Sequence, residues 1–246
     1  MTNLANDAEL ARKVADEAGA ILLSLQRSGL FEGRGLGKAG DRVANALIME
    51  ALKVQRPDDV VLSEEEVSDL SRLTASRVWI VDPLDGTREY GEGRSDWAVH
   101  VALAIDGKAA VGAVALPGLG ETLCSAGCAA PPANEGKLRM LVSRTRPAAE
   151  ALAVAHTLDA ELVPMGSAGA KAMAVVRGEA DIYLHSGGQY EWDNCAPAAV
   201  AKAAGLHVSR IDGSPLRYNR ENSYLPDLLI CPKPLAARIL ALIAVG

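Results

Sequence analysis

Two aspartates separated by two residues stand at the end of a strongly apolar stretch of this 246-residue chain. Asp82 follows the run 78–81, and Asp85 precedes Gly86 and Thr87 in the segment Asp-Pro-Leu-Asp-Gly-Thr. An ionised carboxylate at the end of a buried strand is costly unless water or a cation compensates its charge. Two such carboxylates beside the amides of a helix start could hold divalent cations and an anion together. The alternative is a capped turn, with Asp85 as the helix cap.

Two further acidic segments stand at the ends of expected elements. Glu64 follows the apolar residues 60–62, and Asp193 precedes a segment expected to be helical from residue 194. Their alternative interpretations are a solvated acidic loop and a plain helix cap. Sites collect at element ends in open α/β architectures. The three acidic segments together therefore favour a metal site over three unrelated surface features.

The elements that must position these acids differ between the two halves of the chain. Apolar periodicity and β-branched runs predict two helices followed by mostly antiparallel strands, over residues 7–26, 41–55, 60–62, 78–81, 97–105 and 109–116. An Asp-Gly-Lys turn at 106–108 predicts a hairpin. The glycines between residues 33 and 40 predict a mobile loop.

Residues 127–136, which contain two prolines and an asparagine, are the best candidate for a domain boundary. Beyond them strands and helices alternate, which indicates α/β organisation. The expected strands cover 138–142, 162–165, 181–184 and 228–231, and the expected helices cover 147–158, 171–177, 194–204 and a last one from residue 234. We therefore predict an N-terminal α+β domain over 1–130 and a C-terminal α/β domain over 131–246.

Composition excludes some classes of function. The formal net charge of −6 argues against nucleic-acid binding, which needs clustered Lys and Arg. No apolar run approaches the ~20 residues of a membrane span, and the first residues show no apolar signal core, so we expect no membrane association and a cytoplasmic location. The four cysteines match no zinc pattern and are expected to be free thiols (Cys124, Cys128, Cys195 and Cys231).

The order and spacing of three motifs carry a resemblance to a known family. Residues 63–65, 82–87 and 192–193 are similar to the motifs of the lithium-sensitive, magnesium-dependent phosphatases of the inositol monophosphatase superfamily. The similarity runs from the first helix to the last strand. The sequence Arg-Glu-Tyr at 88–90 and the serine at 63 resemble the CysQ branch, the 3'(2'),5'-bisphosphate nucleotidases, whereas inositol monophosphatases usually carry Asn in place of Glu89.

The resemblance implies a fold, an activity and a cofactor. The fold is a layered αβαβα sandwich, and the activity is hydrolysis of a phosphomonoester, here 3'-phosphoadenosine 5'-phosphate (PAP) to AMP and phosphate. The cofactor is Mg²⁺, with two to three ions of which two share Asp82. The implied ligands are Glu64, Asp82, the Leu84 carbonyl, Asp85 and Asp193. A homodimer is implied by the resemblance alone.

The resemblance also implies roles in catalysis and substrate binding. Asp41, Thr87 and Glu64 would orient or activate the attacking water, although Asp41 could also be only the cap of a helix. The implied substrate-binding residues are Leu84, Asp85, Gly86, Thr87, Ser167, Lys171 and Asp193. The segment around Ser167 is one residue longer than the usual pattern, whereas Lys171 aligns with it. Residues 187–189 could line the sugar side or form a flexible turn, and His100 is expected to be packed rather than catalytic.

Several other functions share parts of this pattern. A phospho-aspartate phosphatase has its two Asp residues at i and i+2, whereas Asp82 and Asp85 are at i and i+3. An inositol monophosphatase or a fructose-1,6-bisphosphatase would share the metal core, and Glu89 and Lys171 favour the nucleotidase over both. A non-catalytic nucleotide sensor would keep the pocket without turnover, and the full set of acids with Thr87 argues against it.

Overall fold

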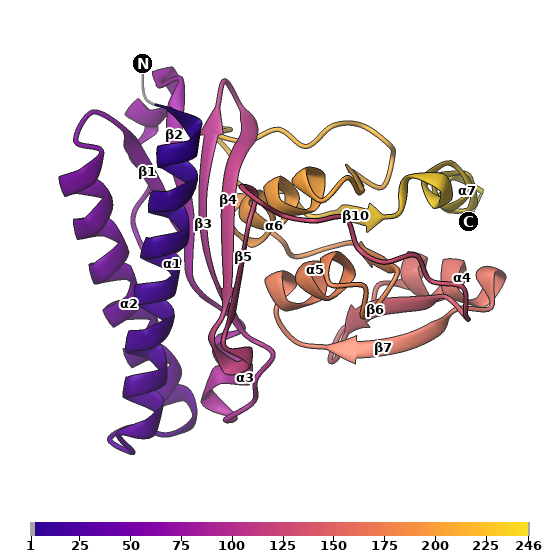
Figure 1. Ribbon diagram of the computed structural model, residues 1–246, viewed down its shortest axis with the longest axis horizontal. Helices are drawn as coiled ribbons and strands as arrows, with labels where there is room; N and C mark the ends of the chain where they lie inside the picture. The colour runs from indigo at the N-terminus through magenta and orange to yellow at the C-terminus, as the bar shows by residue number, and fades with distance from the viewer. Residues whose placement is uncertain (1–2, 246) are drawn as a thin grey trace.

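In the computed structural model, which describes residues 3–245, helices and sheets alternate in five layers (Figure 1). The outer layer is formed by α1 (Leu4–Arg27) and α2 (Gly33–Gln55), which cover one face of the first sheet. The middle layer contains α5 (Ala168–Val176) and α6 (Glu191–Ala203), and the other outer layer contains α4 (Ala149–Leu158) and α7 (Lys233–Ala244). The predicted αβαβα sandwich is confirmed.

The first sheet has the strand order β1-β2-β3-β4-β5. Its strands are β1 (Val60–Ser63), β2 (Arg77–Asp85), β3 (Ala98–Ile105), β4 (Lys108–Leu116) and β5 (Glu121–Cys124). Only β1 and β2 are parallel, and the remaining neighbours are antiparallel. Short helices lie at Leu70–Thr74 (η1), Thr87–Gly91 (α3) and Pro117–Leu119 (η2). The predicted hairpin of β3 and β4 is confirmed, whereas β5 was not predicted.

The second sheet has the order β7-β6-β8-β10-β9. Its strands are β6 (Arg139–Ser143), β7 (Glu161–Met165), β8 (Ile182–His185), β9 (His207–Ser209) and β10 (Leu228–Cys231). Strands β6, β7 and β8 are parallel, and β10 is antiparallel to both of its neighbours. The predicted alternation of strands and helices is confirmed, and the short β9 was missed.

The glycines at 33–40 do not form the predicted mobile loop, because they belong to the first turns of α2. Close packing against α3 explains two of them, Gly37 and Gly40. A Cβ atom at Gly37 would lie 2.6 Å from Thr87 Cγ2, and one at Gly40 would lie 2.9 Å from the Tyr90 ring. Glycine lowers helix propensity by about 1 kcal/mol, but here it lets two helices approach more closely than side chains would allow. A propensity argument cannot detect this compensation.

Along the sequence, all strands of the first sheet come before residues 125–138 and all strands of the second sheet come after them. This agrees with the predicted boundary at residues 127–136. One hydrophobic cluster nevertheless contains residues of both sheets and of the helices between them, including Ile80, Leu141 and Val200. The division into domains 1–130 and 131–246 therefore stays a prediction. None of the helices in the described part is long and apolar enough to cross a membrane. The four cysteines are free, and three of them are buried.

Candidate metal centre and active site

A bulge in β2 brings Asp82 and Asp85 to the same side of the first sheet. Side chains alternate between the two faces of a regular strand, so residues three apart would point to opposite faces. The pairing of β2 with β3 shifts its register between Asp82 and Asp85, as expected of a β-bulge. The predicted tight turn is therefore a bulge within a longer strand, and the chain enters α3 only after Gly86, whose φ is 90°.

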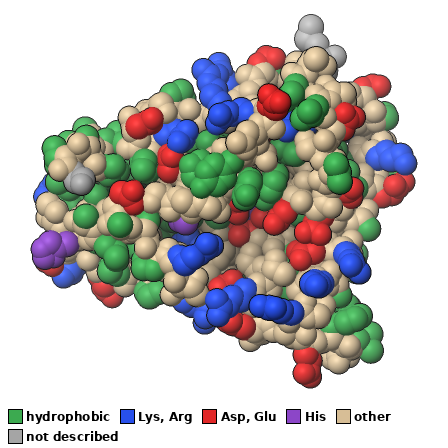
Figure 2. Space-filling view, turned by 180° about the vertical axis from the view of Figure 1, so that it is seen from behind, with side chains coloured by type: hydrophobic (Ala, Val, Ile, Leu, Met, Phe, Trp, Pro, Cys, Tyr) green, Lys and Arg blue, Asp and Glu red, His purple; other side chains and the backbone are tan. Residues whose placement is uncertain are grey.

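Asp193 completes a cluster of three carboxylates. One oxygen from each of Asp82, Asp85 and Asp193 lies within 4.8 Å of the others. Asp82 and Asp85 are buried, and Asp193 is half-buried in the first turn of α6. Figure 2 shows acidic side chains gathered in a hollow of this face, with Lys and Arg side chains along its rim. The structure thus brings Asp193 together with the pair Asp82 and Asp85.

Glu64 lies beside this cluster at an exposed position. Since β1 and β2 are parallel with Ser63 opposite Val81, the residue after β1 is placed next to Asp82. The Glu64 amide donates to the Val81 carbonyl at 3.3 Å, and its carboxyl group lies within hydrogen-bonding reach of Asp82. Asn45 braces this loop, accepting from Ser63 Oγ at 2.8 Å and donating to Glu66 Oε1 at 2.7 Å.

The electrostatics of the cluster favour a bound cation. Burial, with repulsion from Glu64 and Asp85, raises the pKa of Asp82 well above its usual value. Burial and repulsion from Asp85 likewise raise the pKa of Asp193 to about 7. Although Glu64 is accessible to solvent, partial desolvation of its carboxyl group and the nearby acids raise its pKa to about 7 against the hydrogen bond with Asp82. Oxygen donors with this mutual repulsion suit hard divalent cations, so the residues fit a metal ion.

Asp85 differs from its neighbours because three groups surround one of its oxygens. Asp85 Oδ2 accepts from Ser167 Oγ at 2.5 Å and from the Gly169 amide at 2.6 Å. His100 Nε2 lies 3.3 Å from the same oxygen. Burial alone would raise the pKa of Asp85, but these partners outweigh it and lower the pKa to about 2. Asp85 is thus held ionised.

His100 is packed, as predicted, but it also has a polar role that the sequence did not indicate. The side chain is fully buried on β3, opposite Asp82 in the register. Its Nδ1 lies 3.0 Å from the Trp192 carbonyl, next to Asp193. His100 therefore connects Asp85 to the start of α6. An isolated His between apolar residues gives no signal for such a contact, because the partners come from distant segments.

Asp193 belongs to a capping box at the start of α6. The helix begins at Glu191 with Tyr190 as its N-cap, so the alternative interpretation of Asp193 as the N-cap is wrong; Asp193 is the third helical residue, and its Oδ2 accepts from the Tyr190 amide at 2.7 Å. Glu191 is fully buried and accepts from the amides of Asn219 and Arg220 at 2.6 and 2.9 Å. These contacts fix the start of α6 against a distant loop. The cap and a metal ligand can therefore share the Asp193 side chain.

Asp41 faces Thr87 across the contact between α2 and α3. It lies in the interior of α2, so the alternative interpretation as a helix cap is wrong. The carboxyl group is within hydrogen-bonding reach of Thr87, whose Oγ1 also lies 3.1 Å from the Leu84 carbonyl. Burial, with repulsion from Glu65, raises the pKa of Asp41 to about 7. An acid and a hydroxyl in contact at the edge of the cluster could orient a water molecule.

A cavity of about 570 Å³ opens from the carboxylate cluster toward the second sheet. Its walls include the predicted residues Asp85, Gly86, Ser167, Lys171 and Asp193. The buried Lys171 donates from Nζ to the carbonyls of Gly166 and Ser167 at 2.8 and 2.6 Å, and burial lowers its pKa to about 8. The Ser167 hydroxyl is already engaged by Asp85 and by the Ala170 amide.

Arginines line the cavity opposite the carboxylates. Arg144 donates to Glu89 Oε1 and to Glu92 Oε2, each at 2.8 Å. Glu89 is buried, and a Cβ atom on Gly166 would lie only 2.3 Å from its Cγ. Arg146 also lines the cavity and makes no ion pair with the described residues. Neither arginine was predicted as a site residue, because both lie on a loop without a recognisable pattern.

The five-layer fold and a carboxylate centre at the mouth of a cation-lined cavity define a class of metal-dependent phosphatase. The chain belongs to the inositol monophosphatase family, whose sequence profile matches residues 4–244. The predicted membership is confirmed.

Two similar proteins and one similar crystal structure have names that refer to related activities. A protein of Mycobacterium bovis named 3'-phosphoadenosine 5'-phosphate phosphatase is 51% identical over 241 residues, which cover 93% of this chain and 90% of the relative. A protein of Escherichia coli K12 named 3'(2'),5'-bisphosphate nucleotidase CysQ is 34% identical over 201 residues, covering 76% and 81%. The crystal structure of CysQ from Bacteroides thetaiotaomicron superposes with a TM-score of 0.81 at 26% identity, covering 93% and 97%.

Proposed function

We propose that this protein is a Mg²⁺-dependent phosphatase that hydrolyses PAP to AMP and phosphate. The observation that carries the proposal is the polarity of the cavity. Its walls present the carboxylates Asp85 and Asp193 together with the cations Arg146 and Lys171. A bisphosphate needs both kinds of group, because the metal centre takes the phosphate to be cleaved and the cations attract the other one. The relatives named for PAP and for 3'(2'),5'-bisphosphates support the same substrate class.

The proposed centre holds two to three Mg²⁺ ions. Glu64, Asp82 and the Leu84 carbonyl would hold one ion, and Asp82, Asp85 and Asp193 a second, with Asp82 shared. Bound Mg²⁺ would polarise the phosphate and lower the pKa of a bound water. Asp82 suits the shared position because its Oδ1 already accepts from the Leu84 amide at 3.0 Å, which fixes the carboxylate between the two groups of ligands.

The chain's own residues would position the reactants. The Gly86 and Thr87 amides, at the start of α3 where the helix leaves backbone donors free, would bind the phosphate. Asp41 and Thr87 would orient the attacking water, with Asp41 able to take its proton. Ser167 and the Gly169 amide would hold Asp85 ionised and correctly rotated. Lys171 would fix the backbone at 166–167 and supply positive charge to the cavity.

A substrate panel tests this function. Purified protein is supplied with PAP, inositol monophosphate and fructose 1,6-bisphosphate, and phosphate release is measured with Mg²⁺, with EDTA and with added Li⁺. We expect the highest kcat/KM for PAP, no turnover in EDTA and a fall with Li⁺.

The other outcomes separate the competing functions. Equal or faster turnover of inositol monophosphate or fructose 1,6-bisphosphate would overturn the nucleotidase assignment and leave the phosphatase. Tight PAP binding without phosphate release would indicate a nucleotide sensor. An acyl-phosphate trapped on Asp82 would indicate a phospho-aspartate mechanism instead.

A further inference from the structure

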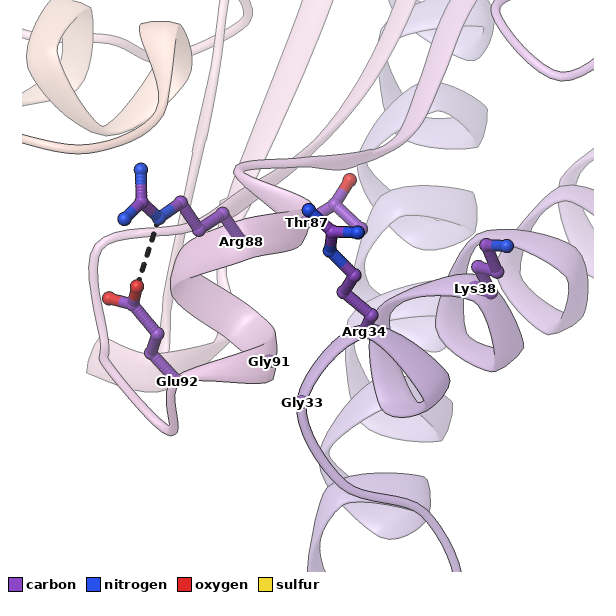
Figure 3. Close-up of a pocket in the computed structure, with 7 residues that line it drawn as sticks. All are labelled: Gly33, Arg34, Lys38, Thr87, Arg88, Gly91 and Glu92. Atoms are coloured by element: carbon purple, nitrogen blue, oxygen red, sulfur yellow. Dashed lines mark hydrogen bonds and ion pairs between the residues drawn. The ribbon is translucent and has the colours of Figure 1, made fainter. Parts of the chain in front are cut away.

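A second cavity, of about 670 Å³, lies next to the predicted phosphate position at Gly86 and Thr87. It lies between α2 and α3, and it is lined by Gly33, Arg34, Lys38, Thr87, Arg88, Gly91 and Glu92 (Figure 3). Asp85 and Gly86 line the substrate cavity, Thr87 lines the second cavity, and Arg88 lines both. The two cavities therefore adjoin at residues 86–88.

Among the described residues, two of the three cations in this second cavity have no acidic partner. Arg88 donates from Nε to Glu92 Oε1 at 3.0 Å, as Figure 3 shows. Arg34 and Lys38 make no ion pair or side-chain hydrogen bond to any residue in the range 3–245. Both side chains are exposed, and Arg34 extends toward the start of α3 in this view. Their positive charge is thus available to a ligand.

The placement of Arg34 and Lys38 opposes the stability of their own helix. Cations near a helix N-terminus face the positive end of the helix dipole, and like charges at i and i+4 repel each other. The first condition holds for Arg34, which lies in the first turn of α2 where no acid is present, and the second holds for the pair Arg34 and Lys38. The cap residue Glu32 makes no side-chain hydrogen bond to the helix either. A bound anion between the two side chains would remove both penalties.

Glycines let the two helices approach closely beside this cavity. Gly33 packs directly on Gly91, where a Cβ atom would lie 2.6 Å from the Gly33 carbonyl oxygen. Both glycines line the cavity together with the cationic side chains and Thr87. Lys38 stands one helical turn before Asp41, so the cations continue the α2 face that carries the proposed water-orienting acid.

We propose that Arg34 and Lys38, with Thr87, form a binding subsite for the orthophosphate released by the reaction. This inference rests on the proposed function, in which water attacks from the side of Asp41 and Thr87. In-line attack carries the phosphorus away from the leaving group and toward the attacking oxygen. The freed phosphate therefore moves toward the second cavity, while the nucleotide stays in the first. Each product has its own exit.

Phosphate binding by metal-free protein tests the subsite without using activity. In EDTA the carboxylate cluster repels phosphate, so binding reports on the cations. Sodium phosphate replaces sodium chloride at constant ionic strength while amide shifts of ¹⁵N-labelled protein are followed by NMR. We expect saturable shifts at residues 33–38 and 87–91 and a rise in the Tm of the wild type. Each of Arg34→Ala and Lys38→Ala should weaken binding by about threefold to tenfold.

Two control variants separate a specific site from general charge. Lys53→Ala removes an equally exposed cation from the far end of α2 and should leave phosphate binding unchanged. The double variant Arg34→Lys/Lys38→Arg keeps both charges and should retain most of the affinity. The subsite is wrong if the wild type shows no saturable shifts there, or if Lys53→Ala weakens binding as much as Arg34→Ala does. PAP turnover is measured separately, so failure of the subsite and failure of the proposed function are distinguishable.

Kinetics of the Mg²⁺-loaded enzyme identify which phosphate the cations hold. If they hold the released one, Arg34→Ala/Lys38→Ala should raise the inhibition constant of orthophosphate severalfold and leave the KM for PAP nearly unchanged. A parallel rise in both constants would mean that the cations hold a phosphate of the substrate, and it would overturn the assignment to the product.

Discussion

The hydroxyl group of Ser167 donates a hydrogen bond of 2.5 Å to the carboxylate of Asp85, a residue 82 positions earlier in the chain. Ser167 is the cap of α5, and its Oγ also accepts from the Ala170 amide at 3.0 Å. One hydroxyl therefore connects the bulge of the first sheet to a helix of the middle layer. Its position in the cavity agrees with the predicted segment, but its hydrogen-bonding capacity is used by the protein itself.

Replacing Ser167 with Ala should weaken metal binding. The change keeps Cβ and the unusual φ of 41°, so it removes only the hydroxyl. Asp85 would lose a partner that keeps it ionised, and groups that orient metal ligands typically contribute about 10- to 100-fold to affinity or activity. Stability should fall by about 1–3 kcal/mol because a buried hydrogen bond and a cap are lost.

Mg²⁺ titration calorimetry and urea unfolding measure the two effects of Ser167→Ala. Ser143→Ala serves as the control, since Ser143 lines the same cavity without contacting Asp85. Unchanged Mg²⁺ affinity with reduced stability would restrict Ser167 to a role as helix cap.

Replacing Asp82 with Asn should separate stability from activity. The Asn carbonyl can still accept from the Leu84 amide, while one charge leaves a cluster of mutually repelling carboxylates. The free energy of unfolding in EDTA should therefore stay the same or rise by about 1 kcal/mol. Phosphate release and the Mg²⁺-induced rise in Tm should be largely lost. If the variant stays active, Asp82 is not a ligand shared by two ions. If the variant is strongly destabilised in EDTA, repulsion between Asp82 and the neighbouring carboxylates does not destabilise the metal-free protein.

The sequence predicted the elements of the site well because Glu64 and Asp82 each follow a recognisable apolar run and Asp193 stands near the start of a recognisable helix. Parallel pairing of β1 with β2 then places Glu64 beside Asp82, and this pairing is a local consequence of two buried strands. The same reasoning missed the bulge. Nothing in Asp-Pro-Leu-Asp distinguishes a turn from a strand that loses register, because the answer depends on how β3 pairs with it.

Contacts between distant segments could not be predicted from local pattern. The partners of Asp85 come from β3 and from α5, and Arg144 reaches Glu89 from the loop after β6. The glycines of α2 gave a misleading signal for the same reason. Their role becomes evident only when α3 is packed against them. Motif spacing predicted the acids that form the carboxylate cluster, whereas the groups that orient them required the three-dimensional structure.

His185 should make stability depend on pH between about 6.5 and 4. Burial, with the positive charges of Lys171 and Arg146, lowers its pKa from 6.5 to about 4. The unfolded chain therefore binds a proton in this window that the folded protein does not, so stability is complete above pH 6.5 and falls as the pH is lowered. The loss attributable to His185 is at most about 3 kcal/mol at pH 4.

The pH effect is measured as the difference between wild type and His185→Gln in urea unfolding at several pH values. The variant should lose less stability than the wild type between pH 6.5 and 4. His156→Gln, on the surface of α4, is the control and should follow the wild type. Parallel curves for wild type and His185→Gln would show that the histidine is not held neutral.

Replacing Gly169 with Ala should disturb the metal centre through His100. The added Cβ would lie 2.0 Å from His100 Nε2 and 3.0 Å from Ala98 Cβ, in a region where both neighbours are fully buried. Overpacking of this kind costs about 1–3 kcal/mol. The displaced imidazole would leave Asp85, so activity should fall with stability. Gly35→Ala is the matched control, because nothing lies within 4 Å of the added atom and a helical Ala is favoured.

A double variant shows whether the clash acts through the histidine. His100→Ala removes the ring that a Cβ at position 169 would strike, so His100→Ala/Gly169→Ala should be destabilised by less than the sum of the two single variants. Activity should stay low in the double variant, because Asp85 still lacks its imidazole neighbour. Urea unfolding in EDTA and PAP hydrolysis in Mg²⁺ measure the two quantities separately. Strict additivity of the two unfolding energies would mean that the added methyl group strains the backbone of α5 and not the contact between His100 and Asp85.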